Sequence, residues 1–465
     1  MRECGSWGIV SASVLVACGG CRSAPPAIAD SGVSGFTLTL GTPTLFATHA
    51  ELVANGFTWG PSDGTMGAAS MGGDNYDFFG AARGSATCTD SPSTQGAFRF
   101  TGTLDHLTGL PAGQCKALFT NGSAPTGWVF DKDYAGGGSV VPFKRGATTG
   151  LLMTYHGEVH WKGPASNGLC GAGVPCFYGG IGMAVSLDDG ATFKSVGQII
   201  QAYPPLSDYQ GGSVNLGMGY GSIVVADANG KWIAAPPADL GNTYLYVFFE
   251  DYDKNGPGPC GKGACVTVAR ARFDQVLDAV VPLASSNPTT VAGLFHKYDA
   301  TAGDPWSSPA TSGDPTENTA SGHFTPLFSD ETDYLPSVIW DNLASAYLMV
   351  HHQYVGGAQP TNFQFRSSTD LLHWSVPIAT FAPPAGKQPF YPTLVGETGD
   401  PLVGGAAPRV YFSTFDLFPD WSNSELDVAD RDALMATMRC FAWIPGKIAT
   451  IASPWNLTNR SRMAN

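Results

Sequence analysis

The chain has 465 residues, of which 43% are hydrophobic and 11% aromatic, enough to bury a large core. Only 13% are charged, and 59 glycines with 34 prolines favour many short strands and turns over long helices. The formal net charge of −14 repels phosphates and anionic lipid, so we expect no nucleic-acid partner.

The N-terminus is typical of an export signal. A positive charge at Arg2 precedes an apolar run, residues 9–17, that is too short to span a membrane. The run ends in Leu15-Val16-Ala17-Cys18, which resembles the lipobox of bacterial lipoproteins. That resemblance implies a signal peptide over residues 1–18 and a lipid on Cys18.

Residues 19–35, rich in small residues and proline, would then be a tether. The alternative is an ordinary signal peptide that is cut near Ala29. In either case we expect an exported protein of the bacterial cell envelope, secreted or held at the membrane through a lipid anchor.

A phrase that recurs four times dominates residues 133–445. Each copy has a β-rich run that opens with a small residue, then an aromatic-rich strand, then a third strand. Residues 36–130 contain strands at 75–79 and 97–101 that we interpret as a fifth, divergent copy. The opening residues of the four clear copies are Ser139, Ser222, Ser337 and Thr393.

This repetition predicts an all-β fold, a five-bladed β-propeller over residues 36–447 with a C-terminal tail at 448–465. A polar insertion at about 284–330 would be either a binding loop or lid, or a disordered surface excursion. Residues 273–280 and 427–438 are candidate short helices.

Cysteine use agrees with export. Two close pairs lie in glycine-rich loops, Cys170 with Cys176 and Cys260 with Cys265, and each is expected to form a disulfide. Cys88 with Cys115 is a plausible third bridge, which leaves Cys440 as a buried thiol. The alternative, a metal site, needs a nearby histidine, and neither loop contains one, so we expect no metal site at these cysteines.

Two turns resemble those of known propeller families. Ser186 to Phe193 matches the Asp-box, Ser-x-Asp-x-Gly-x-Thr-aromatic, of sialidases, where it lies on the outer rim. Ser367 to Trp374 resembles the Ser-x-Asp-Leu-x-x-Trp turn of five-bladed glycoside hydrolases of families 43, 32, 117 and 130. In those hydrolases acidic residues line a central funnel.

The resemblance implies a pool of carboxylates at the funnel. Glycosidic cleavage needs one protonated carboxylic acid and one carboxylate. We expect Asp133 or Asp63 to be the base and Glu158 or Glu250 the acid. The full pool, at the starts of inner strands and the ends of second strands, is Asp63, Asp133, Glu158, Glu250 and Asp333.

Aromatic and histidine side chains beside these acids are expected to contact a sugar. They are Tyr134, Trp161, Tyr220, Tyr334, His352 and Tyr391. No cofactor is expected, although oxygen ligands are dense at residues 250–255, where a structural Ca²⁺ is an alternative to a solvated turn.

These features predict a glycoside hydrolase acting on a polysaccharide or oligosaccharide. Two departures stand against it: no glutamate precedes the inner strand of the middle blade, as family 43 requires, and the arginine triad of sialidases is missing. The alternative is therefore a non-catalytic propeller that binds carbohydrate or another partner.

Overall fold

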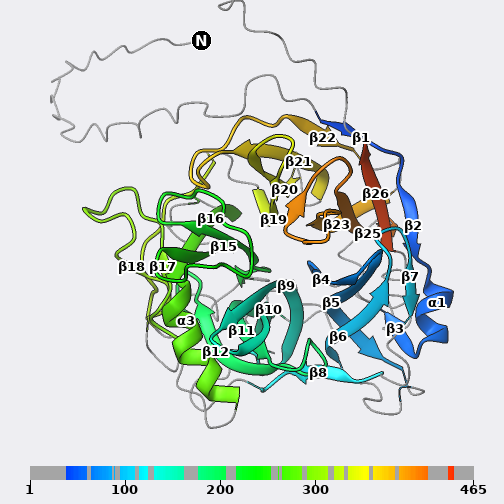
Figure 1. Cartoon of the computed structure of the whole chain (residues 1–465), viewed down its shortest axis with the longest axis horizontal. Helices are drawn as coiled ribbons and strands as arrows, with labels where there is room; N and C mark the ends of the chain where they lie inside the picture. Colours follow the sequence, from blue (N-terminus) through cyan, green and yellow to red (C-terminus); the bar gives the residue numbers. More distant parts are fainter. Residues whose placement is uncertain are drawn as a thin grey trace, which may run out of the picture.

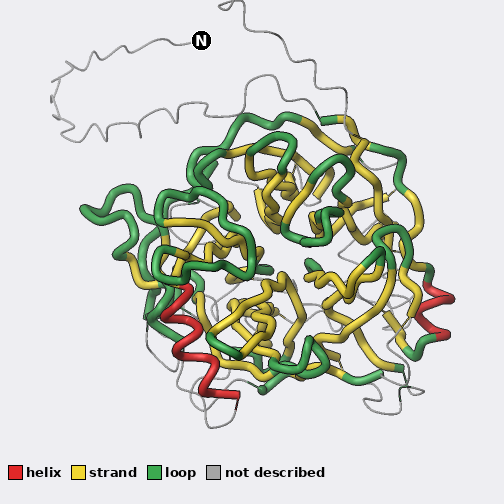
Figure 2. The backbone as a smooth tube through the Cα atoms, viewed as in Figure 1, coloured by secondary structure: helices red, strands yellow, loops and turns green. Residues whose placement is uncertain are grey.

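The computed structural model describes residues 38–59, 64–85, 88, 95–109, 115–123, 130–161, 176–205, 216–252, 260, 264–284, 291–312, 319–328, 333–354, 360–382, 387–416 and 438–444. Strands dominate these residues, and the sheets stand around a common centre in a propeller arrangement (Figure 1). Helices lie only at the periphery of this ring (Figure 2). The all-β propeller predicted from the repeats is thus present.

The described strands form four sheets. The first contains β3 (Phe57–Trp59), β4 (Gly67–Gly72), β5 (Asn75–Gly84), β6 (Gln95–Gly102), β7 (Leu107–Gly109) and β8 (Ala117–Thr120). The second has ten strands: β9 (Tyr134–Arg145), β10 (Thr148–Trp161), β11 (Cys176–Ser186), β12 (Lys194–Ile200), β13 (Leu216–Met218), β14 (Ser222–Asp227), β15 (Thr243–Tyr252), β16 (Ala264–Arg272), β17 (His296–Lys297) and β18 (Ser308–Pro309).

The third sheet contains β19 (Asp333–Asp341), β20 (Ala346–Tyr354), β21 (Pro360–Ser368), β22 (Ala379–Phe381) and β24 (Val403–Gly404). The fourth contains β23 (Lys387–Val395), β25 (Arg409–Asp416), β26 (Met438–Ile444), β1 (Thr39–Leu40) and β2 (Thr44–Ala47). The helical segments are α1 (His49–Ala54), α3 (Phe273–Val280) and the 3₁₀ turn η2 (Val281–Ala284).

The prediction of five blades is wrong: the structure shows four. The reason is β13, a three-residue strand that pairs in parallel with β11 and antiparallel with β15. It joins two copies of the repeated phrase into one ten-stranded sheet. So short a strand with a central glycine carries no sequence pattern that would reveal this junction.

The small residue that opens each repeat holds the ring together. Each side-chain hydroxyl oxygen accepts a hydrogen bond from a backbone N–H of the next inner strand, across the gap between two repeats. The four bonds run from Ile223 to Ser139 (3.1 Å), from Val338 to Ser222 (3.0 Å), from Leu394 to Ser337 (2.9 Å) and from Met66 to Thr393 (2.9 Å).

The two ends of the described chain meet in the fourth sheet. The N-terminal strands β1 and β2 both pair antiparallel with the C-terminal strand β26, blue beside red in Figure 1. Next to this seam the Tyr411 hydroxyl donates to the Leu104 carbonyl at 2.6 Å. The ring is therefore closed by pairing between segments from opposite ends of the described chain, which ties its folding to both of them.

The insertion is packed at the periphery of the ring. Helix α3, predicted from the sequence, buries Phe273, Val276, Leu277 and Val280. Beyond it, Val291, Phe295 and Ala310 have 0% exposed surface, and β17 pairs with β16. The alternative of a disordered excursion is wrong for these residues, because their apolar side chains complete the core of the ten-stranded sheet.

In both predicted turns the aspartate Oδ1 accepts from the serine hydroxyl two residues before it and from a backbone N–H later in the turn. Asp188 Oδ1 accepts from the Thr192 N–H at 2.9 Å, and Asp370 Oδ1 accepts from the His373 N–H at 2.9 Å. The aromatic residue that follows each turn packs into the core: Phe193 on Phe79 and Trp374 on Phe248. The turns thus fix the hairpin ends and leave the centre of the ring to other residues.

Two of the three expected disulfides are present, Cys88–Cys115 and Cys260–Cys265. Cys170, Cys18 and residues 427–437 of the second candidate helix lie outside the described residues, as does the side chain of Cys440. Among the described helices, none is long and apolar enough to cross a membrane.

We expect Ser222→Ala to destabilise the fold by about 1–3 kcal/mol, because it leaves the buried N–H of Val338 without its acceptor. Ser70→Ala is the control, since that hydroxyl makes only an exposed contact beside the β4–β5 turn. Denaturant unfolding of both variants measures the difference. Equal stability of the two would show that the hydroxyl bonds contribute nothing to the ring.

Candidate functional site

Glu158 and Glu250 end the second strands of two successive repeats, and the register places them on one face of the ten-stranded sheet. Glu158 on β10 pairs with Gly179 on β11, Gly179 with Gly217 on β13, and Gly217 with Tyr252 on β15. Glu250 stands two residues before Tyr252, and such residues share a face. The strand β13 is therefore what brings the two carboxylates onto a common surface.

Glu158 lies between two histidines of its own strand. His156 and His160 are two residues to either side, so all three side chains share a face. The Nε2 atoms of His156 and His160 lie 2.9 Å and 2.5 Å from the two carboxylate oxygens. Burial alone would raise the pKa of Glu158, but the hydrogen bonds from both histidines outweigh it and lower that pKa. Glu158 is therefore ionised at neutral pH.

Glu250 has the opposite electrostatic environment. It is 5% exposed, and its Oε2 accepts from the backbone N–H of Leu335 at 3.0 Å. Burial raises the pKa of Glu250 to about 8, and the Leu335 and Gly219 N–H groups offset only part of that effect. Glu250 is thus mainly protonated at neutral pH, an acid that can donate a proton.

Glycines let these side chains lie flat against the sheet. A Cβ on Gly219 would stand 1.7 Å from Oε1 of Glu250, and one on Gly179 would stand 2.8 Å from Cε1 of His156. Any larger residue at 219 would displace the carboxyl group. The residues predicted from the sequence did not include Gly219, His156, His160 or Leu335. The alternating His-x-Glu-x-His run on β10 was the one visible signal among them.

Four predicted tyrosines gather beside the acids. Tyr134, Tyr220 and Tyr334 form one buried cluster, against which Tyr391 packs. The hydroxyls of Tyr134 and Tyr220 lie 2.8 Å apart, and the ring of Tyr220 lies 4.8 Å from the ring of His156. The cluster therefore connects to Glu158 through His156. Its role in sugar binding stays a prediction.

His352 does not share this position. It has 0% exposed surface, and its ring packs on Phe363 at 4.8 Å and Tyr334 at 4.8 Å. Burial lowers the pKa of His352, so it is neutral. The neighbouring His351 is equally buried, with Nε2 3.0 Å from Nε of Arg366. Both rings fill the interior of the sheet, and a role for His352 in substrate contact stays a prediction.

The other candidates are only partly placed. Asp133 Oδ2 accepts from the backbone N–H of His160 at 2.8 Å, which puts this carboxylate beside the Glu158 strand. Asp63 lies outside the described residues, as do the side chains of Asp333 and Trp161. Their roles stay predictions.

The Ca²⁺ alternative is untested. Oδ2 of Asp251 is already bound to Lys297 and to the Tyr203 N–H, while Asp253 and Asn255 lie outside the described residues. Within the described ranges, no group of three or more His, Cys, Asp or Glu side chains is arranged to hold a metal ion.

No protein-family model matches the sequence, and no curated protein matches it. Solved structures with a similar fold include the catalytic domain of a GH62 alpha-L-arabinofuranosidase from Coprinopsis cinerea, at 10% identity and a TM-score of 0.40, over 89% of this chain and 98% of that one. A glycosyl hydrolase from Bacteroides ovatus matches at 12% identity and a TM-score of 0.37, over 89% and 92%.

An exo-beta-1,3-galactanase from Clostridium thermocellum matches at 11% identity and a TM-score of 0.36, over 82% of this chain and 59% of that one. Identities this low give no residue-by-residue correspondence. The chemistry of the site has to be argued from its own residues.

The raised pKa of Glu250 predicts a stability change with pH. Its folded pKa of about 8 exceeds the value of 4.5 for an ordinary glutamate, so stability is full below 4.5 and is lost as the pH rises through 8. Glu250→Gln removes this loss, on the order of a few kcal/mol. We expect the variant to gain stability relative to wild type between pH 5 and pH 9.

Thermal unfolding of both proteins at several pH values measures this gain. The relevant quantity is how the stability difference between Glu250→Gln and wild type changes with pH. Any loss of stability from the amide itself is the same at every pH and therefore does not affect this change. A difference that stays flat from pH 5 to pH 9 would contradict a buried, protonated Glu250.

Proposed function

We propose that this protein is a glycoside hydrolase that acts on a polysaccharide or oligosaccharide. One observation carries the proposal: two largely buried carboxyl groups on one face of one sheet have pKa values shifted in opposite directions. Such divergence separates a proton donor from a base at the same pH. Glycosidic cleavage requires this pair of roles.

Glu250 supplies the acid. Its proton passes to the glycosidic oxygen as the bond between that oxygen and the anomeric carbon breaks. Glu158, already ionised, is the partner that activates water or attacks the anomeric carbon, and the separation of the two carboxyl groups on bound substrate decides between these outcomes. The lowered pKa of Glu158 favours the base role over the acid role considered from the sequence.

The surroundings fit this division of roles. His156 and His160 keep Glu158 negative, and the buried site of Glu250 keeps its proton in place until a leaving oxygen accepts it. Beside the acids, the buried rings of Tyr134, Tyr220 and Tyr334 pack together, and the partly buried Tyr391 is the member that keeps exposed surface on which a sugar can stack. In this proposal the acid is Glu250, one of the two acids expected from the sequence. The base is Glu158 in place of the expected Asp133 or Asp63, with Asp133 as its neighbour.

Export belongs to the proposal as well. The lipobox-like Leu15 to Cys18 supports a lipid anchor on Cys18, and the two disulfides suit an oxidising compartment. An enzyme in that location would meet glycans outside the cytoplasm.

We expect Glu250→Gln and Glu158→Gln each to reduce hydrolysis about 10²- to 10⁴-fold, as loss of an acid or a base does. The measurement is release of reducing sugar by the purified chain from a panel of neutral and acidic polysaccharides. Activity should fall as the pH rises through about 8, where Glu250 loses its proton.

Asp278→Asn is the matched control, because this carboxylate is exposed on α3 and, among the described residues, forms its ion pair with Arg145 at the surface. It should keep full activity. Wild-type hydrolysis that survives both glutamine variants would overturn the assignment. Glycan binding without hydrolysis by the wild type would favour the non-catalytic alternative.

A further inference from the structure

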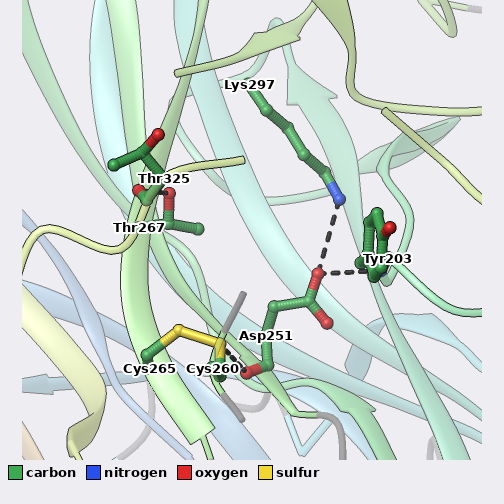
Figure 3. Close-up of a disulfide and its surroundings, with 7 residues drawn as sticks. All are labelled: Tyr203, Asp251, Cys260, Cys265, Thr267, Lys297 and Thr325. Carbon is green, nitrogen blue, oxygen red and sulfur yellow. Dashed lines mark hydrogen bonds and ion pairs between the residues drawn. A yellow bond between two sulfur atoms is a disulfide. The ribbon is translucent and has the colours of Figure 1, made fainter. Parts of the chain in front are cut away.

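A buried ion pair lies directly behind the Glu250 end of β15. Lys297 Nζ and Asp251 Oδ2 are 3.4 Å apart, and their side chains are 0% and 1% exposed. The ammonium also donates to the Ser321 hydroxyl at 2.7 Å, and Asp251 Oδ2 accepts from the Tyr203 N–H at 2.8 Å. Figure 3 shows the contacts from Lys297 and Tyr203 converging on one carboxylate oxygen.

The partners of Asp251 come from distant parts of the chain. Lys297 and Ser321 belong to the peripheral insertion, and Tyr203 follows β12 of the preceding repeat. Ser321 in turn donates to the Ala202 carbonyl at 2.9 Å. The pair therefore fastens the end of β15 to two other segments. An apolar pair of similar volume would often be at least as stable, so stability alone does not explain this charged one.

The position of Asp251 connects this cluster to the candidate acid. Adjacent strand residues point to opposite faces, so Asp251 holds β15 from one side while Glu250 faces Gly219 and Leu335 on the other. Across the strand Asp251 pairs with Cys265, whose disulfide to Cys260 closes the connection between β15 and β16. The strand end that carries Glu250 is thus held by Lys297 of the insertion, by the Tyr203 N–H and by the Cys260–Cys265 disulfide.

We propose that Asp251 and Lys297 are positioning residues for Glu250, which hold its carboxyl group over Gly219 and against the Leu335 N–H. The catalytic meaning of this inference rests on the proposed function, but the placement of Glu250 does not. In this arrangement the insertion supports the acid: it supplies the amine of Lys297 that pairs with the buried Asp251 carboxylate.

The charges around Glu250 give the sign of the expected effect. On its own strand, the negative charge of Asp251 raises the pKa of Glu250, after burial as the main cause. The N–H groups of Leu335 and Gly219, on neighbouring segments, bond to Glu250 and lower its pKa. On β16 the residue paired with Glu250 is the uncharged Val266. Removal of the charge pair takes away the negative neighbour and loosens the burial, and both changes lower the pKa.

The test is the double variant Asp251→Asn with Lys297→Met, which leaves no unpaired buried charge. We expect the alkaline limit of activity to move down by on the order of one pH unit. A second readout needs no substrate. Glu250→Gln is introduced into both the wild type and the double variant, and the pH at which the stability difference it causes levels off, about 8 in the wild type, should show the same downward shift.

The matched control is Asp77→Asn with Arg99→Met. This is another buried pair, whose side chains are 1% and 14% exposed. It lies in the first sheet beside the β4–β5 turn, at the strand end opposite to the one that carries Glu158 and Glu250 in the ten-stranded sheet. It should lower the unfolding temperature comparably and leave the Glu250 transition unmoved. An unmoved transition in the Asp251/Lys297 variant, or an equal shift in the control, overturns the positioning role. A stability shift with no hydrolysis by any form upholds it and refutes the proposed enzyme.

Discussion

The ring depends on hydrogen bonds made by the small residue that opens four of the repeats. A serine or threonine oxygen accepts the backbone N–H of the next inner strand, and four such bonds link the repeats around the centre. Where these four bonds form, the two inner strands share no ladder, so a side chain satisfies the buried backbone N–H. A small residue is required because the strands converge there. The same bonds fix where each of these inner strands begins along the axis of the ring. They therefore also fix the position of the residues just before it, which border the candidate site.

A strand that joins two repeats creates the candidate site. Strand β13 crosses the gap and pairs on both sides, which merges two repeats into a continuous surface. Along it, Gly179, Gly217 and Gly219 separate Glu158 from Glu250. The carboxyl groups share a floor and yet have different neighbours: two imidazoles at one, backbone N–H groups and low polarity at the other. This asymmetry is what makes an acid and a base from two identical side chains.

The sequence predicted what depends on repetition and missed what depends on contacts between repeats. The four opening residues, the two turns and α3 follow from local patterns, and the tyrosines follow from their place before the inner strands. Strand β13 did not, because Leu216-Gly217-Met218 acquires its structure only from β11 and β15. The ionisation states of Glu158 and Glu250 were equally hidden: both end a second strand, and only the folded neighbours distinguish them. The burial of His352, with 0% exposed surface, was also hidden, because strand alternation says which face a residue takes, not whether that face is covered.

The Glu250 site also explains an unusual backbone. Leu335 has a φ of 53°, in the left-handed region, directly before Pro336, and the ladder between β19 and β20 shifts register there. Such a conformation costs on the order of 1–3 kcal/mol for a residue with a side chain. The bulge removes the Leu335 N–H from the ladder, and Glu250 accepts it; Pro336 has no N–H that would be left over. Tyr391-Pro392 repeats the device on β23, with a φ of 55° at Tyr391, whose ring meets Tyr220 at 5.9 Å. The bulge thus has a different use in each repeat. At Leu335 it frees an N–H that Glu250 accepts, and at Tyr391 it places an aromatic side chain against the tyrosine cluster. In both repeats the hydroxyl two residues later, on Ser337 or Thr393, accepts from the next inner strand.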